Sequence, residues 1–137
     1  METQVLNLFI VDDNKLTANT LELYLKARFG SGICISTFYD GETCLKNMDK
    51  ETNIIVLDYF MKEANGLEVL KAIKAVNPRT EVIMLSSNED IAVAIDLFKA
   101  GAKDYVVKGI GAWKKVGNMI NTIITRPIQV FIRGFFR

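Results

Sequence analysis

Five apolar runs alternate along the chain with stretches in which apolar residues recur every three or four positions. The runs cover residues 5–11, 32–38, 53–58, 81–86 and 104–108. Short runs rich in Val and Ile, bounded by glycine or polar residues, are typical of strands buried in a sheet. The stretches between them have the period of helices that cover such a sheet.

The intervening stretches predict five helices whose ends are marked by glycine, proline or asparagine. The first three run over residues 16–29, over residues 42–48, and from Gly66 to the Asn77-Pro78 pair. The fourth follows the polar residues 88–90 and ends at Gly101, with apolar positions Ile91, Ala94, Ile95 and Phe98. The fifth has one apolar stripe, which consists of Trp113, Val116, Met119, Ile120, Ile123 and Ile124.

Strands that alternate with helices form right-handed crossovers, and these produce a parallel sheet covered on both faces. We therefore predict an α/β fold with a doubly wound five-stranded parallel sheet, strand order 2-1-3-4-5, and five flanking helices. This is the flavodoxin-like arrangement. A closed barrel would need about eight such units. Residues 1–125 are predicted to form this single domain.

Charged and hydroxyl side chains follow four of the five predicted strands. They are Asp12 and Asp13, Asp58, Ser86, and Lys108. Because the carboxyl ends of parallel strands meet at one edge, these groups should lie together. Three converging carboxylates repel one another and raise at least one pKa. An all-oxygen cluster of this kind suits Mg²⁺.

This set predicts an anion site that contains a nucleophile. A carboxylate such as Asp58 forms an acyl phosphate when the attacked phosphoryl group is held in line. Lys108 and Ser86 would each meet a phosphoryl oxygen where negative charge develops. A simpler interpretation is that the aspartates cap helices or begin turns. The neighbouring Ser87 is an alternative to Ser86.

Four segments together resemble the receiver domain of bacterial two-component response regulators, in particular stand-alone, chemotaxis-regulator-like members. They are Phe9–Asn14, Ile55–Asp58 with Met61 and Gly66-Leu67, Met84–Ser86, and Gly101–Lys108. The resemblance extends to about residue 121, and the predicted strand order rests partly on it. It implies a phosphorylation-dependent switch in the cytoplasm, which accepts phosphate with Mg²⁺ from a sensor histidine kinase or phosphotransfer protein and acts on a downstream protein target.

The resemblance also implies a role for each site residue. Asp58 would be the phosphoacceptor and Asp13 the direct metal ligand, with Asp12 acting through water. The backbone carbonyl of Phe60 would complete the protein ligands. Lys108 would pair first with the acceptor and then with the phosphoryl group. The switch residues would be Ser86 and Tyr105.

Three positions depart from the family pattern. Lys62 and Gly109 stand where the family usually has proline, so we expect a looser loop around Lys62 and a trans Lys108–Gly109 peptide or a rearranged loop. A cis bond that does not precede proline costs roughly 2.5–4 kcal/mol. Phe60 is bulky at a position that often contacts the attacking water, which predicts slow loss of phosphate.

Composition narrows the function classes further. The chain has no histidine, so it has neither Ser-His catalysis nor a phosphohistidine of its own. The spacing of Cys34 and Cys44 predicts buried free thiols. The amino-terminal segment has neither a secretory signal nor a membrane span, which favours the cytoplasm. No direct binding of nucleic acid is expected.

Residues 126–137 form a basic and aromatic tail. All 16 acidic residues precede it, and the tail contains Arg126, Arg133 and Arg137. Pro127 predicts the start of a short extra C-terminal helix. Its apolar positions are Ile128, Phe131, Ile132, Phe135 and Phe136. A face of this kind packs on the domain, on a second copy or on an anionic membrane surface, and we expect a homodimer first.

Three rival functions stay open. A degenerate receiver would bind partners without phosphate. An aspartate-nucleophile phosphohydrolase commonly has an Asp-x-Asp pair, whereas Asp12 and Asp13 are adjacent. A nucleotide- or flavin-binding domain would have a glycine-rich loop after the first strand, and this chain has none there.

Overall fold

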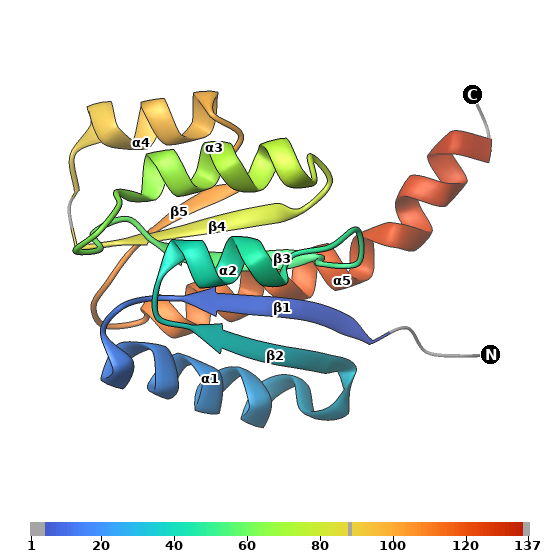
Figure 1. Cartoon of the computed structure of the whole chain (residues 1–137). Coiled ribbons are helices and arrows are strands. Elements are labelled where there is room, and N and C mark those ends of the chain that lie inside the picture. Colours follow the sequence, from blue (N-terminus) through green and yellow to red (C-terminus); the bar gives the residue numbers. More distant parts are fainter. Residues whose placement is uncertain (1–4, 88, 136–137) are drawn as a thin grey trace.

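The computed structural model describes residues 5–87 and 89–135, with side chains described as far as Thr125. Strand and helix alternate from β1 to α5 (Figure 1). The strands are β1 (Leu6–Val11), β2 (Ile33–Phe38), β3 (Ile54–Asp58), β4 (Glu81–Ser86) and β5 (Asp104–Val107). The helices are α1 (Lys15–Phe29), α2 (Gly41–Asn47), α3 (Gly66–Val76), α4 (Ile91–Lys99) and α5 (Ala112–Phe135), and a 3-10 turn, η1 (Gly30–Gly32), precedes β2.

The five strands form one parallel sheet in the order β2-β1-β3-β4-β5. This confirms the predicted fold class and strand order. The register aligns the strand ends, because Leu57 lies opposite Val11 and Ser86 lies opposite Val107. The residues that follow these strands therefore share one edge of the sheet.

The sheet separates two apolar cores. Helices α1 and α5 cover one face, and helices α2, α3 and α4 cover the other (Figure 1). All five residues of β3 are buried, as expected for a central strand with helices on both sides. The α1 side of the core contains Ala18, Leu21 and Leu25, and the α3 side contains Val69, Leu70 and Ile73.

Side chains other than the predicted site acids cap the helices. Asn14 Oδ1 accepts a hydrogen bond from the Thr17 N–H of α1 at 3.1 Å. Asn65 Oδ1 accepts one from the Glu68 N–H of α3 at 3.0 Å. The interpretation of Asp12, Asp13 and Asp58 as helix caps is therefore wrong, and these three acids are available for other contacts.

Helix α4 packs through a different face from the one that the apolar spacing suggests. Leu97 is its one fully buried side chain, whereas Ile91, Ile95 and Phe98 are 74%, 46% and 47% exposed. The helix has the sequence IAVAIDLFK, which is apolar almost all round. Periodicity therefore could not identify the side that meets the sheet.

Helix α5 continues through the position where a separate helix was predicted. It runs without interruption from Ala112 to Phe135, and its last turns extend past the sheet (Figure 1). The prediction of a short extra helix after Pro127 is therefore wrong, since proline removes one backbone hydrogen bond without forbidding helical backbone. The predicted burial of the tail's apolar face concerns side chains outside the described residues. Within the described residues, no helix is long and apolar enough to cross a membrane.

Both cysteines are free. Cys44 is buried in the core beside α3, as predicted. Cys34 is exposed instead, because it lies on the edge strand β2, where side chains alternate between the core and the outside.

Gly66 lets α3 begin directly against the end of β3. Its N–H donates to the Tyr59 carbonyl at 2.8 Å. A Cβ at this position would lie 2.7 Å from Tyr59 Cα and 2.9 Å from Met84 Cε. The loop that follows Asp58 therefore closes tightly only with glycine at position 66.

We predict that Gly66→Ala lowers the free energy of unfolding by about 1–3 kcal/mol, because the added methyl group displaces backbone. Urea unfolding monitored by circular dichroism measures this. Gly32→Ala is the matched control, because a Cβ there has no neighbour within 4 Å. Equal stabilities of the two variants would contradict the prediction.

Candidate functional site

Three carboxylates converge at the carboxyl edge of the sheet. Asp12 and Asp13 follow β1, and Asp58 is the last residue of the adjacent strand β3. One oxygen from each side chain lies within 4.8 Å of one oxygen from each of the others. Asp12 and Asp58 are buried, and Asp13 is half-buried at the rim. The convergence expected from the strand ends is therefore observed.

Lys108 binds two of these carboxylates from the end of β5. Its Nζ lies 3.1 Å from Asp12 Oδ2 and 3.0 Å from Asp58 Oδ1. The side chains of Asp12 and Asp58 are only 2% and 4% exposed, and that of Lys108 is 24% exposed. One ammonium group thus partly neutralises three acids, and it does so where little water reaches the charges.

Burial and mutual repulsion control the ionisation of Asp58. Burial, and then the charge of Asp12, raise the pKa of Asp58 to about 6 even though Lys108 lowers it. For Lys108, burial alone lowers the pKa, but the contacts and charges of Asp58 and Asp12 outweigh it, so its pKa is raised. At neutral pH the pair is therefore a carboxylate next to a firmly charged ammonium group.

One oxygen of Asp58 lacks a hydrogen-bond partner. Asp58 Oδ1 is buried and accepts no hydrogen bond from the described residues. Lys108 Nζ donates a hydrogen bond to Asp12 Oδ2 and forms an ion pair with Asp58 Oδ1 at 3.0 Å. A buried oxygen of this kind needs a further positive or donor partner.

The donor set fits a small hard cation. It consists of the carboxylate oxygens of Asp12, Asp13 and Asp58, and one of these, Asp58 Oδ1, is buried without a hydrogen bond. Mg²⁺ prefers oxygen ligands, usually one or two carboxylates with waters. These acids could therefore hold Mg²⁺. The expected contribution of the Phe60 carbonyl stays a prediction.

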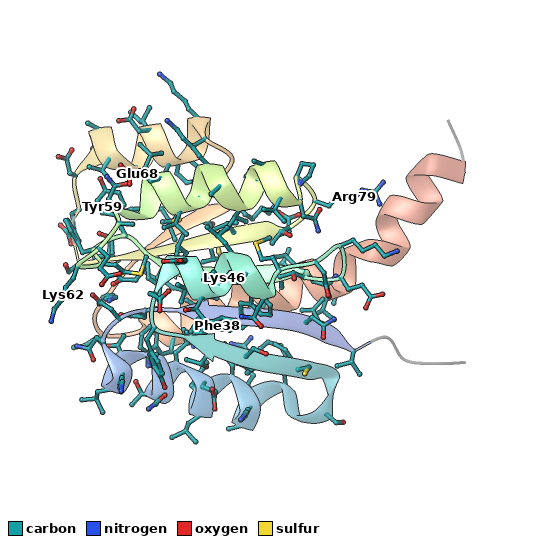
Figure 2. All side chains as sticks on the ribbon, in the orientation of Figure 1. Phe38, Lys46, Tyr59, Lys62, Glu68 and Arg79 are labelled. Carbon is teal, nitrogen blue, oxygen red and sulfur yellow. The ribbon has the colours of Figure 1, made fainter. Side chains whose placement is uncertain are left out.

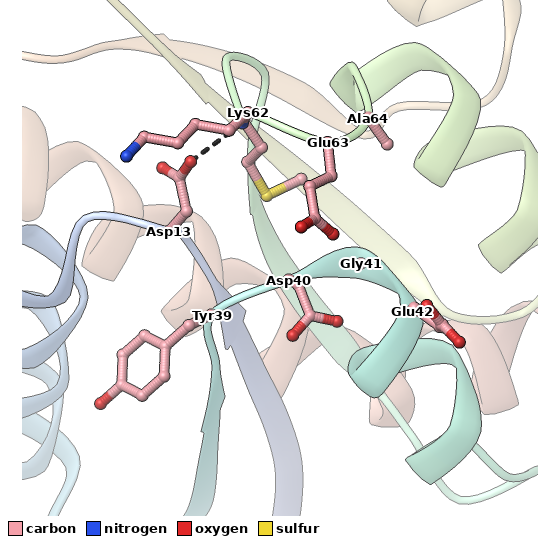
Figure 3. A pocket seen from close by; sticks show the side chains of 9 residues that line it. Asp13, Tyr39, Asp40, Gly41, Glu42, Lys62, Glu63 and Ala64 are labelled. Atoms are coloured by element: carbon pink, nitrogen blue, oxygen red, sulfur yellow. Dashed lines mark hydrogen bonds between the residues drawn. The ribbon is translucent and has the colours of Figure 1, made fainter.

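The loop between β3 and α3 reaches across to Asp13. The Lys62 N–H donates to Asp13 Oδ2 at 3.0 Å, as the dashed line in Figure 3 shows. The contact borders a pocket of about 350 Å³, lined by Asp13, Tyr39, Asp40, Gly41, Glu42, Met61, Lys62, Glu63 and Ala64 (Figure 3). The Lys62 side chain is exposed at the outer edge of the same loop (Figure 2). Sequence reasoning missed this backbone contact, although the missing proline at position 62 was a signal for it.

Ser86 and Tyr105 lie on the same side of the sheet. Ser86 is fully buried at the end of β4, whereas Ser87 is exposed. Tyr105 lies opposite Met84, two residues before Ser86, and it is half-buried against the α3 side of the core. Their roles as switch residues stay predictions.

The Lys108–Gly109 peptide is trans, as predicted, because the described residues contain no cis peptide bond. Gly109 has φ of 143°, a value that proline, with φ near −65°, cannot adopt. The loop after β5 therefore follows a path that requires glycine at this position.

Three large, exposed apolar side chains lie at the same edge of the sheet as the charged centre. Leu16, Phe60 and Ile110 are 74%, 51% and 108% exposed. They belong to three segments that follow β1, β3 and β5, and so lie at the same edge as the acids. Sequence reasoning did not identify Leu16 or Ile110, because exposure of a single apolar residue is decided by its neighbours in space.

Comparison with known proteins gives a consistent result. The sequence model of the response regulator receiver domain matches residues 8–118. The chain is 29% identical over 104 residues to the transcriptional regulatory protein ZraR of Salmonella typhimurium, covering 75% of this chain and 23% of that protein. It is 29% identical over 106 residues to DcuR of Escherichia coli, covering 76% of this chain and 44% of that protein. The chain thus spans less than half of these curated relatives.

Solved structures agree in fold. The BeF3-activated DrrB receiver domain superposes with a TM-score of 0.79 at 26% identity, covering 90% of this chain and all of that one. CheY in the CheX-CheY-BeF3-Mg+2 complex from Borrelia burgdorferi superposes with a TM-score of 0.74 at 28% identity, covering 85% of this chain and 87% of that one.

The raised pKa of Asp58 makes its ionisation destabilising. The Asp58 carboxyl group contributes most to the stability of the fold below its unfolded pKa of about 4, and this contribution is lost as the pH rises through about 6. We predict that the free energy of unfolding of Asp58→Asn, relative to that of the wild type, rises by roughly 1–2 kcal/mol between about pH 4.5 and about pH 7.5.

Urea unfolding at both pH values, with a chelator present, measures this difference. Asp96→Asn on the exposed surface of α4 is the control and should show no such growth. If the difference in free energy of unfolding between Asp58→Asn and the wild type were the same at both pH values, the electrostatic argument would be contradicted.

Proposed function

The chain belongs to the response regulator receiver domain family, and from that premise we propose that it is a phosphorylation-dependent signalling switch with Asp58 as the phosphoacceptor. The observation that carries this proposal is the convergence of the Asp58 carboxylate, the Lys108 ammonium group and the two acids that follow β1. A carboxylate nucleophile, the Lys108 ammonium group and oxygens that could bind a metal ion then lie close together.

The proposed reaction is transfer of a phosphoryl group from a partner's phosphohistidine. A carboxylate oxygen of Asp58 attacks phosphorus, a P–O bond forms, and the P–N bond breaks with its electron pair leaving on the imidazole nitrogen. Catalysis of this kind is mainly positioning and charge stabilisation.

Lys108 and Ser86 stabilise the charge that develops. Lys108 already contacts Asp58 at 3.0 Å, so its ammonium group can follow the negative charge onto a phosphoryl oxygen. Ser86 supplies a hydroxyl from the end of the neighbouring strand. Mg²⁺, held by Asp12, Asp13 and Asp58, would supply Lewis-acid stabilisation of the transferred group. One solved relative is described with BeF3 and Mg²⁺ bound, which supports this assignment.

The phosphoryl donor would be a separate protein. The chain contains no histidine, so it cannot supply the phosphohistidine itself. The side chains of Leu16, Phe60 and Ile110 are exposed at the edge of the sheet where the acceptor lies, and they provide apolar contact area for a docking partner. A sensor histidine kinase or a phosphotransfer protein fits this requirement.

Output would depend on a surface formed by α4, β5 and α5. Phosphate at Asp58 would attract the Ser86 hydroxyl, and Tyr105 would turn inward on the same side of the sheet, shifting an existing equilibrium. Ile91, Ile95 and Phe98 of α4 are exposed and offer an apolar face to a downstream protein. The exposure of these three residues supports a protein partner as the target.

The rival functions have less support. A phosphohydrolase of this chemistry commonly has an Asp-x-Asp pair, whereas Asp12 and Asp13 are adjacent. The described residues consist of five strand–helix units, with no inserted segment to enclose a substrate. A degenerate receiver would be expected to lack part of the acidic set, whereas here all three acids and Lys108 converge.

We predict that incubation with Mg²⁺ and acetyl phosphate adds a single phosphoryl group, detected by mass spectrometry of the intact protein. Asp58→Asn should abolish the adduct, and Asp96→Asn should keep it. A chelator should also prevent it. Turnover of many acetyl phosphate molecules without an adduct would favour a phosphohydrolase, and no adduct at all would favour a degenerate receiver.

Phe60 should slow the loss of phosphate, because its bulky side chain leaves little room for an attacking water and offers it no hydrogen bond. We predict that Phe60→Asn speeds autodephosphorylation severalfold, because the smaller amide side chain admits the attacking water and can hydrogen-bond to it. Decay of the adduct is followed by mass spectrometry after removal of the donor. Phe60→Leu should decay at nearly the wild-type rate, and an unchanged rate in Phe60→Asn would refute the idea.

A further inference from the structure

Asp13 is held by a different donor from the other two acids of the site. Asp12 is bound by the Asn14 N–H at 2.9 Å and by Lys108. Asp58 is held by its ion pair with Lys108. Among the described residues, the one hydrogen-bond donor to the Asp13 carboxylate is the Lys62 N–H, at 3.0 Å from Oδ2. Asp13 is also the least buried of the three acids, so its orientation depends most on this contact.

We propose that the backbone N–H of Lys62 is a positioning group for the metal site, which orients the Asp13 carboxylate toward the cation held by the three acids. This inference rests on the proposed function, since it concerns the same metal site. It assigns the effect to the peptide group of Lys62 and not to its ammonium group.

The local geometry makes the N–H an effective restraint. Lys62 lies in a loop whose two ends are fixed, at one end by β3 and at the other by the hydrogen bond from the Gly66 N–H to the Tyr59 carbonyl at 2.8 Å. A donor on an anchored loop restricts its acceptor more than a donor on a free one. One hydrogen bond to Oδ2 restricts the rotation of the carboxylate and leaves lone pairs for a cation.

The Lys62 side chain is a poorer candidate for this role. It is exposed at the outer edge of the loop (Figure 2), and no ion pair between its ammonium group and a described acid is observed. An exposed ammonium group without a fixed partner contributes little orientation. The peptide N–H, by contrast, is directed at Asp13 (Figure 3).

A pair of variants at one position separates the two groups. Lys62→Pro removes the N–H, whereas Lys62→Ala removes the side chain and keeps the N–H. Isothermal titration with Mg²⁺ should show about tenfold weaker binding for Lys62→Pro, the lower end of the range for groups that orient a metal ligand. Lys62→Ala should bind within about twofold of the wild type.

The outcomes distinguish this inference from the function on which it rests. Wild-type affinity in Lys62→Pro overturns the inference alone, and so does an equal loss in Lys62→Ala, because that would assign the effect to the side chain. Absence of Mg²⁺ binding by the wild type would overturn both proposals.

A second measurement needs neither metal nor the proline variant. Amide hydrogen exchange followed by NMR should show the Lys62 N–H protected in the metal-free wild type and several times faster to exchange in Asp13→Ala. The Ala92 N–H, which donates to Asp90 at the start of α4, is the internal control and should not change. Unaltered exchange at Lys62 in Asp13→Ala would overturn the inference even if Lys62→Pro fails to fold.

Discussion

The structure depends on one electrostatic arrangement, in which the Lys108 ammonium group lies 3.1 Å from Asp12 and 3.0 Å from Asp58. Two nearly buried carboxylates would repel each other strongly in the absence of a cation. Lys108 relieves that repulsion only in part, because Asp13 adds a third acid to the cluster. The remaining negative charge suits the site to a divalent cation, and its electrostatic cost is visible in the raised pKa of Asp58.

The rest of the fold tolerates this cost because the supporting strands are apolar and buried. Every residue of β3 is buried, and the helices on both sides of the sheet complete the two cores. The strand ends are thereby held in register, so that residues from β1, β3 and β5 meet without any direct sequence proximity. A rigid apolar scaffold that holds a charged and unfavourable cluster at its edge is a common arrangement for functional sites.

Residues other than proline at positions 62 and 109 change which backbone hydrogen bonds and dihedral angles are possible in the two loops beside the site. At position 62, the residue keeps an N–H that proline would lack, and this N–H binds Asp13. At position 109, glycine adopts a positive φ that proline could not reach. The loop around Lys62 was expected to be looser than in the family, but this hydrogen bond restrains it. Both loops keep the acids and Lys108 together without proline at these two positions.

Period, length and strand ends predicted the five strands and the meeting of Asp12, Asp13, Asp58 and Lys108, because parallel pairing brings strand ends to one common edge. The strand order was predicted partly from the family resemblance. Packing in three dimensions decided which side of α4 is buried, that α5 continues through Pro127, that Cys34 is exposed, and that the Lys62 N–H reaches Asp13. A nearly uniform apolar helix has no preferred face until a sheet lies beside it, and the absence of proline at position 62 kept an N–H there without indicating which acceptor it would meet. These features depend on contacts between residues that are distant in the sequence, and local sequence patterns do not reveal such contacts.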